Sequence, residues 1–284
     1  MKRIALLILA SVIVLPAQSR RTAGPSELSS LPRQTAHFQE AKARPKSALV
    51  DPADRVFVDV LSGGGWETLI TFVNMSNTGA QFTLTFYDDN GNPLKVPLTN
   101  PDGSVSRFAA VNFSMDGNTS QELVVANVDN NVNYAWSYLS FPGDSAPIAG
   151  MAVVRTYDSS GNIFNETTET LSNIQDFDFF APYDNLQGVA TGLIVLNPGA
   201  SLTAGVTISA QGASGNELIR DKFLLPPGAR TTIMLPDAYK VLAGTSGKLR
   251  VIGDTSQLSA ILFRISPAGS MAYSPIFNWS GLFQ

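Results

Sequence analysis

From residue 55 onward, the chain alternates apolar and polar positions in short runs separated by Gly, Asn, Asp and Pro. In residues 82–86, Phe and Leu alternate with Thr, and Thr71 likewise lies between Ile70 and Phe72. A period of two is typical of a strand with one dry face and one wet face. Helix-period segments are almost absent, and short strands at this spacing are typical of sandwiches and barrels. The pattern therefore predicts an all-β protein.

Two runs are apolar at every position, residues 151–154 and residues 261–263. Continuous apolar runs predict strands that are buried on both faces. We expect both to be central core strands. One segment departs from the strand pattern: at residues 235–244, a proline, an Asp that could cap a helix and a terminal Gly bracket about two turns of helix. It is expected to cover one end of the second sandwich described below.

The segment Asp88-Asp89-Asn90-Gly91-Asn92 lies between two strand-like runs. Asn-Gly tolerates positive φ, so the segment predicts the turn of a hairpin. Its carboxylates also make Asp88 and Asp89 weak candidates for a calcium site. However, Phe86 and Pro97 stand where an EF-hand loop needs acids. Turn chemistry is the favoured interpretation, and we expect no metal and no cofactor.

An internal repeat organises the chain. Gly65–Asn74 aligns without gaps to Gly188–Asn197, and a glycine turn follows each copy, at Gly91 and Gly215. The same strand and the same turn at a nearly constant offset predict two copies of one domain.

Further along, residues 148–155 resemble residues 258–264. The fold class is therefore predicted as two tandem antiparallel β-sandwich domains related by an internal repeat, with one short helix in the second. The domains are expected at residues 55–172 and 173–284. The first copy is expected to be longer around residues 112–146.

Residues 1–19 read as a signal peptide, with Lys2 and Arg3 before an apolar run and small residues after it, and cleavage after Ala17 or Ser19. The apolar run of about a dozen residues falls short of the roughly 20 that span a bilayer. No integral membrane span is expected after cleavage. Prolines punctuate residues 20–54, which predict a flexible basic tether. The predicted location is secreted or at the cell surface, with the periplasm as an alternative.

Charge and composition narrow the function classes. The net charge is −4, but the first 50 residues are basic and the remainder is acidic, which disfavours a nucleic-acid partner. The chain has no cysteine, which excludes disulfides and thiolate chemistry. The single histidine, His37, lies in the tether without a positioned carboxylate and is interpreted as solvated.

Known catalytic motifs are missing from the sequence, and no catalytic residue is predicted. Carboxylate pairs call for one enzymatic test, because a glycosidase needs only two acids at the right separation. Asp176 with Asp178, and Glu166 with Glu169, are candidates by number only. The favoured interpretation of the first pair is a polar strand edge that prevents aggregation.

Aromatic residues are the better indication of binding, since sugar rings stack on aromatic faces. The candidates for a ligand-binding platform are Trp66, Trp136, Tyr134 and Tyr138. Packing in a sandwich core is the competing interpretation.

Several turn and strand sequences of this chain resemble those of a known group of β-sandwich proteins. They are Gly63-Gly64-Gly65-Trp66, Tyr87-Asp88-Asp89-Asn90-Gly91-Asn92-Pro93-Leu94, Leu225-Pro226-Pro227-Gly228, and Leu262-Phe263-Arg264 before Pro267-Ala268-Gly269. On these residues the chain resembles secreted tandem-repeat, immunoglobulin-like β-sandwich proteins of unknown function from environmental bacteria. The resemblance covers roughly residues 55–277; it implies a fold and no catalytic residues.

The sequence thus predicts an exported, non-catalytic β-sandwich protein for extracellular binding, adhesion or assembly. Its expected partner is an extracellular protein or a glycan. Three alternatives remain open: a carbohydrate-binding module, an outer-membrane β-barrel and a secreted glycosidase.

Overall fold

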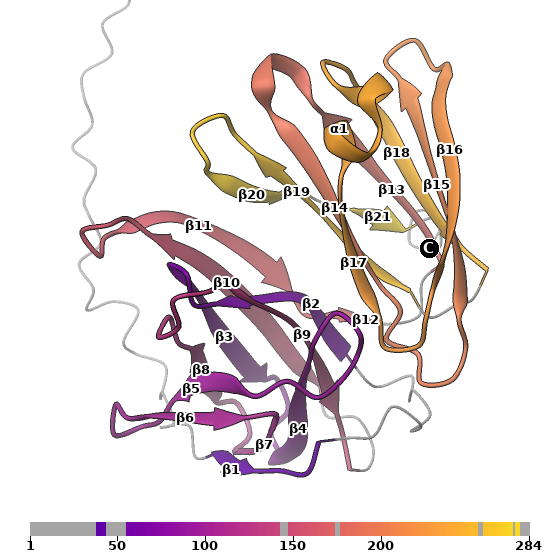
Figure 1. The fold of residues 1–284 in the computed structure, drawn as a ribbon. Helices are drawn as coiled ribbons and strands as arrows, with labels where there is room; N and C mark the ends of the chain where they lie inside the picture. Colours follow the sequence, from indigo (N-terminus) through magenta and orange to yellow (C-terminus); the bar gives the residue numbers. More distant parts are fainter. Residues whose placement is uncertain are drawn as a thin grey trace, which may run out of the picture. The chain divides into compact units, whose positions relative to one another are not determined.

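The computed structural model describes residues 38–43, 55–142, 147–173, 177–254, 258–274 and 276–278. Within them the chain forms four antiparallel sheets, and the predicted all-β sandwich fold is confirmed (Figure 1). His37, Asp176 and residues 1–37, which hold the predicted signal peptide and part of the tether, lie outside the described residues.

The first sandwich is formed by two sheets. One has the order β1-β7-β4-β9-β2-β12 and the other the order β11-β10-β3-β8-β5-β6. The strands are β1 (Phe38–Glu40), β2 (Arg55–Ser62), β3 (Trp66–Asn74), β4 (Ala80–Tyr87), β5 (Val96–Thr99), β6 (Val105–Phe108), β7 (Ala110–Met115), β8 (Ser120–Val125), β9 (Asn133–Ser140), β10 (Ile148–Tyr157), β11 (Ile163–Thr170) and β12 (Ser172–Asn173).

The second sandwich has the sheet orders β16-β15-β18-β13-β21 and β17-β14-β19-β20. Its strands are β13 (Asp178–Asp184), β14 (Ala190–Leu196), β15 (Ala204–Gly212), β16 (Glu217–Leu225), β17 (Arg230–Met234), β18 (Ser246–Gly253), β19 (Ser259–Ile265), β20 (Met271–Ser274) and β21 (Phe277–Asn278). A 3₁₀ turn, η2 (Leu186–Gly188), precedes β14.

Both sandwiches have the same strand order. The sheet β7-β4-β9-β2-β12 corresponds to β16-β15-β18-β13-β21, and β11-β10-β3-β8 corresponds to β20-β19-β14-β17. Pairing is nested in each copy, since in the first β4 pairs with β7, β3 with β8, and β2 with β9. Nesting places consecutive strands β2 and β3 in different sheets, whereas the first two strands of an immunoglobulin domain share a sheet. The order is closer to a jelly roll.

The extra length of the first copy lies in the β5–β6 hairpin, between β4 and β7, and not around residues 112–146 as the sequence suggested. The predicted hairpin after β4 is present but very short. The Asn-Gly turn closes with Gly91 at a φ of 70° and a single bridge between Tyr87 and Pro93. Both flanks of β4 are already paired, to β7 and β9, so the chain crosses to the other sheet, where β5 pairs with β8.

Part of the segment predicted as a flexible tether is a strand. β1 pairs with the edge strand β7, with Phe38 opposite Phe113. The Phe38 ring also lies 6.1 Å from the ring of Phe108 in an edge-to-face contact. This pairing covers backbone groups that an open sheet edge would leave unpaired. The expectation of an unstructured tether is therefore wrong for residues 38–40.

Identical residues hold identical turns in the two copies. The buried Asn74 donates to the carbonyls of Thr78 and Asp116. The buried Asn197 donates in the same way to those of Leu202 and Leu225. Each asparagine thereby ties the loop after one strand to the loop after another, so the sequence alignment of these two positions reflects a shared structural role.

Three apolar clusters form the interior. One fills the first sandwich around Phe72 and Phe113, and a second fills the other sandwich around Tyr183 and Val206. The third is built from both copies. Its buried members are Val56, Val58, Leu61, Tyr87, Trp136, Tyr138, Val154, Ile194, Leu196, Ile261, Phe263 and Met271. The sandwiches therefore have their own cores and share a junction.

The predicted helix of the second copy is present but shorter than two turns. It consists of α1 (Leu235–Ala238) and the 3₁₀ turn η3 (Lys240–Leu242). Leu235 and Leu242 point into the core of the second sandwich, so the segment contributes to the core as well as closing the loop.

Candidate functional site

A buried arginine lies at the junction of the two copies. Arg230 begins β17 of the second copy, and its side chain is 1% exposed. Its Nη1 donates to Asp59 Oδ1 at 2.7 Å and to the carbonyls of Val58 and Ala135, both at 3.0 Å. Its Nε donates to Asp89 Oδ1 at 2.8 Å. All four partners belong to the first copy, so one side chain connects the two sandwiches.

A strand irregularity brings Asp59 to the arginine. The register between β2 and β9 shifts between Phe57 and Val60, which leaves Val58 and Asp59 without ladder partners. Such a bulge re-aims a side chain. Asp59 is buried, and its second carboxylate oxygen accepts a hydrogen bond from the Tyr273 hydroxyl at 2.8 Å.

The backbone of the bulge is held by a second buried acid. Glu169 of β11 accepts hydrogen bonds from the amides of Val58, at 2.5 Å, and Asp59, at 3.0 Å. Burial raises the pKa of Glu169 to about 8, and nearby Asp59 adds to the rise, while the amide bonds and Arg230 oppose it. Burial also raises the pKa of Tyr273 well above its usual value.

We call Arg230, Asp59, Asp89, Glu169 and Tyr273 the clasp. Burial alone would lower the pKa of Arg230, but Asp59 and Asp89 outweigh it and raise that pKa. The guanidinium is therefore charged, and the oxygens of Asp59 and Glu169 already accept bonds from protein donors. Arg230 and Asp59 thereby link the two sandwiches, and Glu169 fixes the backbone segment that presents Asp59.

Beside the clasp, the turn at Gly91 of the first copy contacts the turn at Gly228 of the second copy. A Cβ on Gly91 would lie 2.4 Å from the carbonyl oxygen of Gly228, which is closer than atoms can approach. The Arg230 amide also donates to the carbonyl of Asp89 at 2.9 Å. Glycine is needed at position 91 both for its positive φ and for this close approach.

The aromatic candidates for ligand binding do not form one exposed platform. Trp136 and Tyr138 are buried in the shared apolar cluster, and Trp66 packs against that cluster while partly buried. Only Tyr134, at 54% exposed, is open to solvent. The Trp136 ring stacks on Tyr87 with a centroid distance of 4.5 Å, and its indole NH donates to the carbonyl of Asp88 at 3.0 Å. For Trp136 and Tyr138, the packing interpretation applies.

The calcium candidates are engaged in other contacts. Asp88 accepts hydrogen bonds from the amides of Asn90 and Asn92, which shapes the turn, and Asp89 binds Arg230. No group of three or more potential metal ligands occurs in the part of the chain that the structure describes.

The acids considered for glycosidase chemistry are dispersed. Asp178 forms two hydrogen bonds with Arg250, Glu166 binds Arg155, and Glu169 is in the clasp. Asp178 was expected on a polar strand edge that faces solvent. That expectation is wrong, because its side chain lies beside Arg250 and is only 10% exposed.

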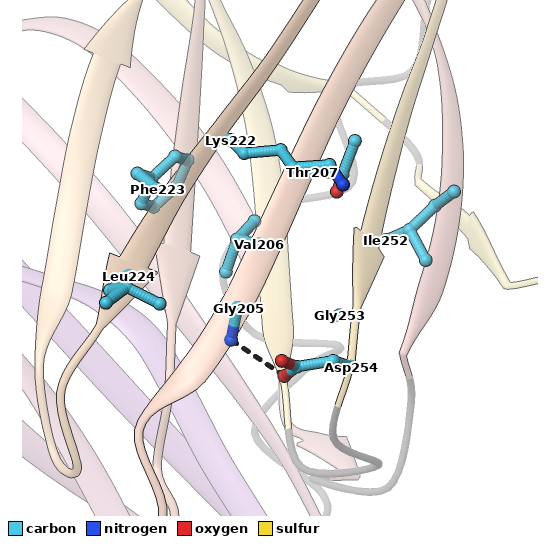
Figure 2. A pocket seen from close by; sticks show the side chains of 9 residues that line it. All are labelled: Gly205, Val206, Thr207, Lys222, Phe223, Leu224, Ile252, Gly253 and Asp254. Carbon is cyan, nitrogen blue, oxygen red and sulfur yellow. Dashed lines mark hydrogen bonds between the residues drawn. The ribbon is translucent and has the colours of Figure 1, made fainter.

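One surface depression of about 340 Å³ lies on the second copy, over β16, β15 and β18 (Figure 2). The outward side chains of this sheet include Thr207, Lys222, Leu224 and Ile252, and Lys248 and Arg250 continue the row along β18. Figure 2 shows Asp254 at one end, where it accepts a hydrogen bond from the Gly205 amide. We call this surface the β18 face.

A second outer surface lies on the first copy, on β11, β10, β3 and β8. It is formed by the side chains that point away from the core, among them Leu69, Thr71, Val73, Met151 and Val153. Val73 is 40% and Met151 41% exposed. Residues 151–154 were predicted to be buried on both faces, which is wrong for Met151; the matching run 261–263 is buried because the junction covers it. We call this surface the β3 face.

Comparison with known proteins gives no family for the chain. No protein-family model matches it, and no curated protein matches it either. Within the described ranges, no helix has the length and apolar character needed to cross a membrane.

The sequence analysis did not single out Arg230, Asp59 or Tyr273, because no motif marks them and their partners are far away in the sequence. Arg230 follows a Pro-Pro-Gly-Ala turn that looks like any strand entrance, and Asp59 is 171 positions away. The one usable signal was Asp59 itself, a single acid within the apolar run 56–61. An acid at a core position needs a partner, and a partner search could have started there.

Proposed function

We propose that this chain is an exported, non-catalytic protein that acts in extracellular assembly by presenting the outer surfaces of two rigidly coupled sandwiches. The clasp is the observation that carries the proposal. Trp136 and Tyr138, which could have stacked a ligand, pack in the junction between the two copies, and Glu169 holds the bulge that places Asp59 beside Arg230. A rigid tandem unit with sheet faces on its outside suits recognition of surfaces better than turnover of small molecules.

Export is tested by expressing the full chain with a C-terminal tag in a bacterial host. The mature protein should be recovered outside the cytoplasm, with an N-terminus at Gln18 or Arg20. Recovery of the chain in the cytoplasm with Met1 retained would contradict the proposal.

Absence of catalysis is tested on the same protein with a broad panel of glycosidase and esterase substrates. We expect no turnover above that of the variant Asp178→Asn. Turnover by the native chain that Asp178→Asn abolishes would overturn the non-catalytic assignment. A glycan array with Tyr134→Ala as control tests the carbohydrate-binding alternative, which has lost two of its four aromatic candidates to burial.

A further inference from the structure

The internal junction joins two different faces of the same fold. The second copy contributes the outer face of β14 and β19, with Ile194, Leu196, Ile261 and Phe263. The first copy contributes the outer face of β2 and β9, with Val56, Val58, Trp136 and Tyr138. Because unlike faces meet, the contact is heterologous, and each copy retains the face that its neighbour uses.

Strand register identifies the first of the remaining faces. Met151 lies opposite Thr71 on β3, as Ile261 lies opposite Ile194 on β14. Thr71 and Ile194 correspond in the ungapped repeat. The β3 face is therefore the counterpart of the surface with which the second copy covers the first.

The β18 face is the counterpart of the covered surface. Tyr87 lies opposite Trp136 near the end of β4, and Gln211 lies opposite Lys248 near the end of β15. Lys248 thus occupies the position of Trp136, and Arg250 that of Tyr138. In the described part of the chain, neither the β3 face nor the β18 face is packed against another element.

The two faces differ in charge in a complementary way. The outward charged side chains on the β3 face are Glu67, Glu122, Glu166 and Arg155, which leaves it acidic. On the β18 face, Arg220, Lys222, Lys248 and Arg250 outnumber Asp178, Glu217 and Asp254, which leaves it basic. Glu122 lies beside Thr71 near the middle of one face, and Lys248 replaces an aromatic near the middle of the other.

We propose that the chain associates head to tail with further copies of itself, the β3 face of one chain meeting the β18 face of the next. This inference rests on the proposed assembly function and names its partner. The clasp is not repeated between chains, because Ser120 stands where Arg230 would be, opposite Val73 as Arg230 is opposite Leu196. The contact between chains is therefore weaker than the internal junction and depends on salt.

Sedimentation velocity of the exported mature protein tests the proposal. The average mass should rise with protein concentration at low salt and fall back toward that of one chain at high salt. Glu122→Lys and Lys248→Glu should each weaken association by roughly tenfold or more, because each places like charges together. The double variant, which restores opposite charges, should regain association. Glu40→Lys and Lys240→Glu are matched controls at exposed positions outside both faces and should behave like the native chain.

The inference would be overturned if the native chain stayed monomeric at every concentration, or if the double variant stayed dissociated. It would also be overturned if only one of the two single variants lost association, because a symmetric contact of one face with itself would give that result. Association that begins only after residues 20–37 are deleted would also overturn it, since the tether would then occupy a face. Each of these results leaves the export and turnover tests unaffected, so failure here is distinct from failure of the proposed function.

Discussion

At the scale of single residues, the junction depends on acids that have lost contact with water. The local sequence Glu166-Thr167-Thr168-Glu169-Thr170 reads as a polar, solvent-facing strand. Glu169 is nevertheless buried, because the β2 bulge covers it. Sequence patterns predict which side of a strand a residue faces, but they do not predict what a distant segment places over that side.

Glu169 should make stability fall as pH rises. Its pKa is about 8 in the folded protein and near 4.5 when unfolded, so between these values the folded state binds the additional proton. The stabilisation is complete below about pH 4.5 and is lost as pH rises through 8. Urea unfolding of the native chain and of Glu169→Gln, at several pH values from 5 to 9, measures the slope. The variant should lose less stability over this range; parallel curves would refute the assignment.

At the scale of elements, the repeat was the most informative sequence feature. It correctly paired β3 with β14, including Asn74 with Asn197, because those residues perform the same local task in both copies. It misplaced the extra length of the first copy, since the turn at Gly91 resembles the one at Gly215 although the following strands belong to different sheets. A turn sequence specifies that the chain reverses direction. It does not specify whether the next strand can pair with the strand before the turn, because other strands can already occupy both of its edges.

Replacing either buried asparagine by alanine should destabilise its own sandwich to a similar extent. Each substitution removes the two hydrogen bonds that a buried side-chain amide donates, which costs about 1–3 kcal/mol. Asn162→Ala removes an amide from an exposed turn and is expected to cost less than about 0.5 kcal/mol. Chemical denaturation of the three variants measures the difference. A large loss at one asparagine only would show that the copies no longer share the device.

At the scale of the whole molecule, each sandwich has its own apolar core, and one apolar junction joins the two sandwiches. Composition and periodicity predicted the cores, since each is made of alternating apolar positions within its own repeat. The junction escaped prediction because Trp136 and Tyr138 present the same signature whether they bind a ligand or a neighbouring sandwich. Aromatic residues on an outer sheet face identify a contact surface, but not the molecule that covers it.

Arg230→Ala should uncouple the two sandwiches. It leaves Asp59 buried without its cation, a loss of about 3–5 kcal/mol. Calorimetry should show one unfolding transition for the native chain and two separated ones for the variant. Arg220→Ala, which breaks an exposed pair with Glu217, is the control and should leave stability nearly unchanged while keeping a single transition. Equal effects of the two substitutions would contradict the role of the clasp.

The division of the junction between the two halves of the chain also governs biogenesis. The half made first carries Val56, Val58, Trp136 and Tyr138, and the residues that cover them come from β14 and β19, synthesised later. A nascent chain halted after the first copy therefore exposes a wide aromatic surface to its surroundings. Protection of this surface by a chaperone is most needed in that interval, before the last strands arrive.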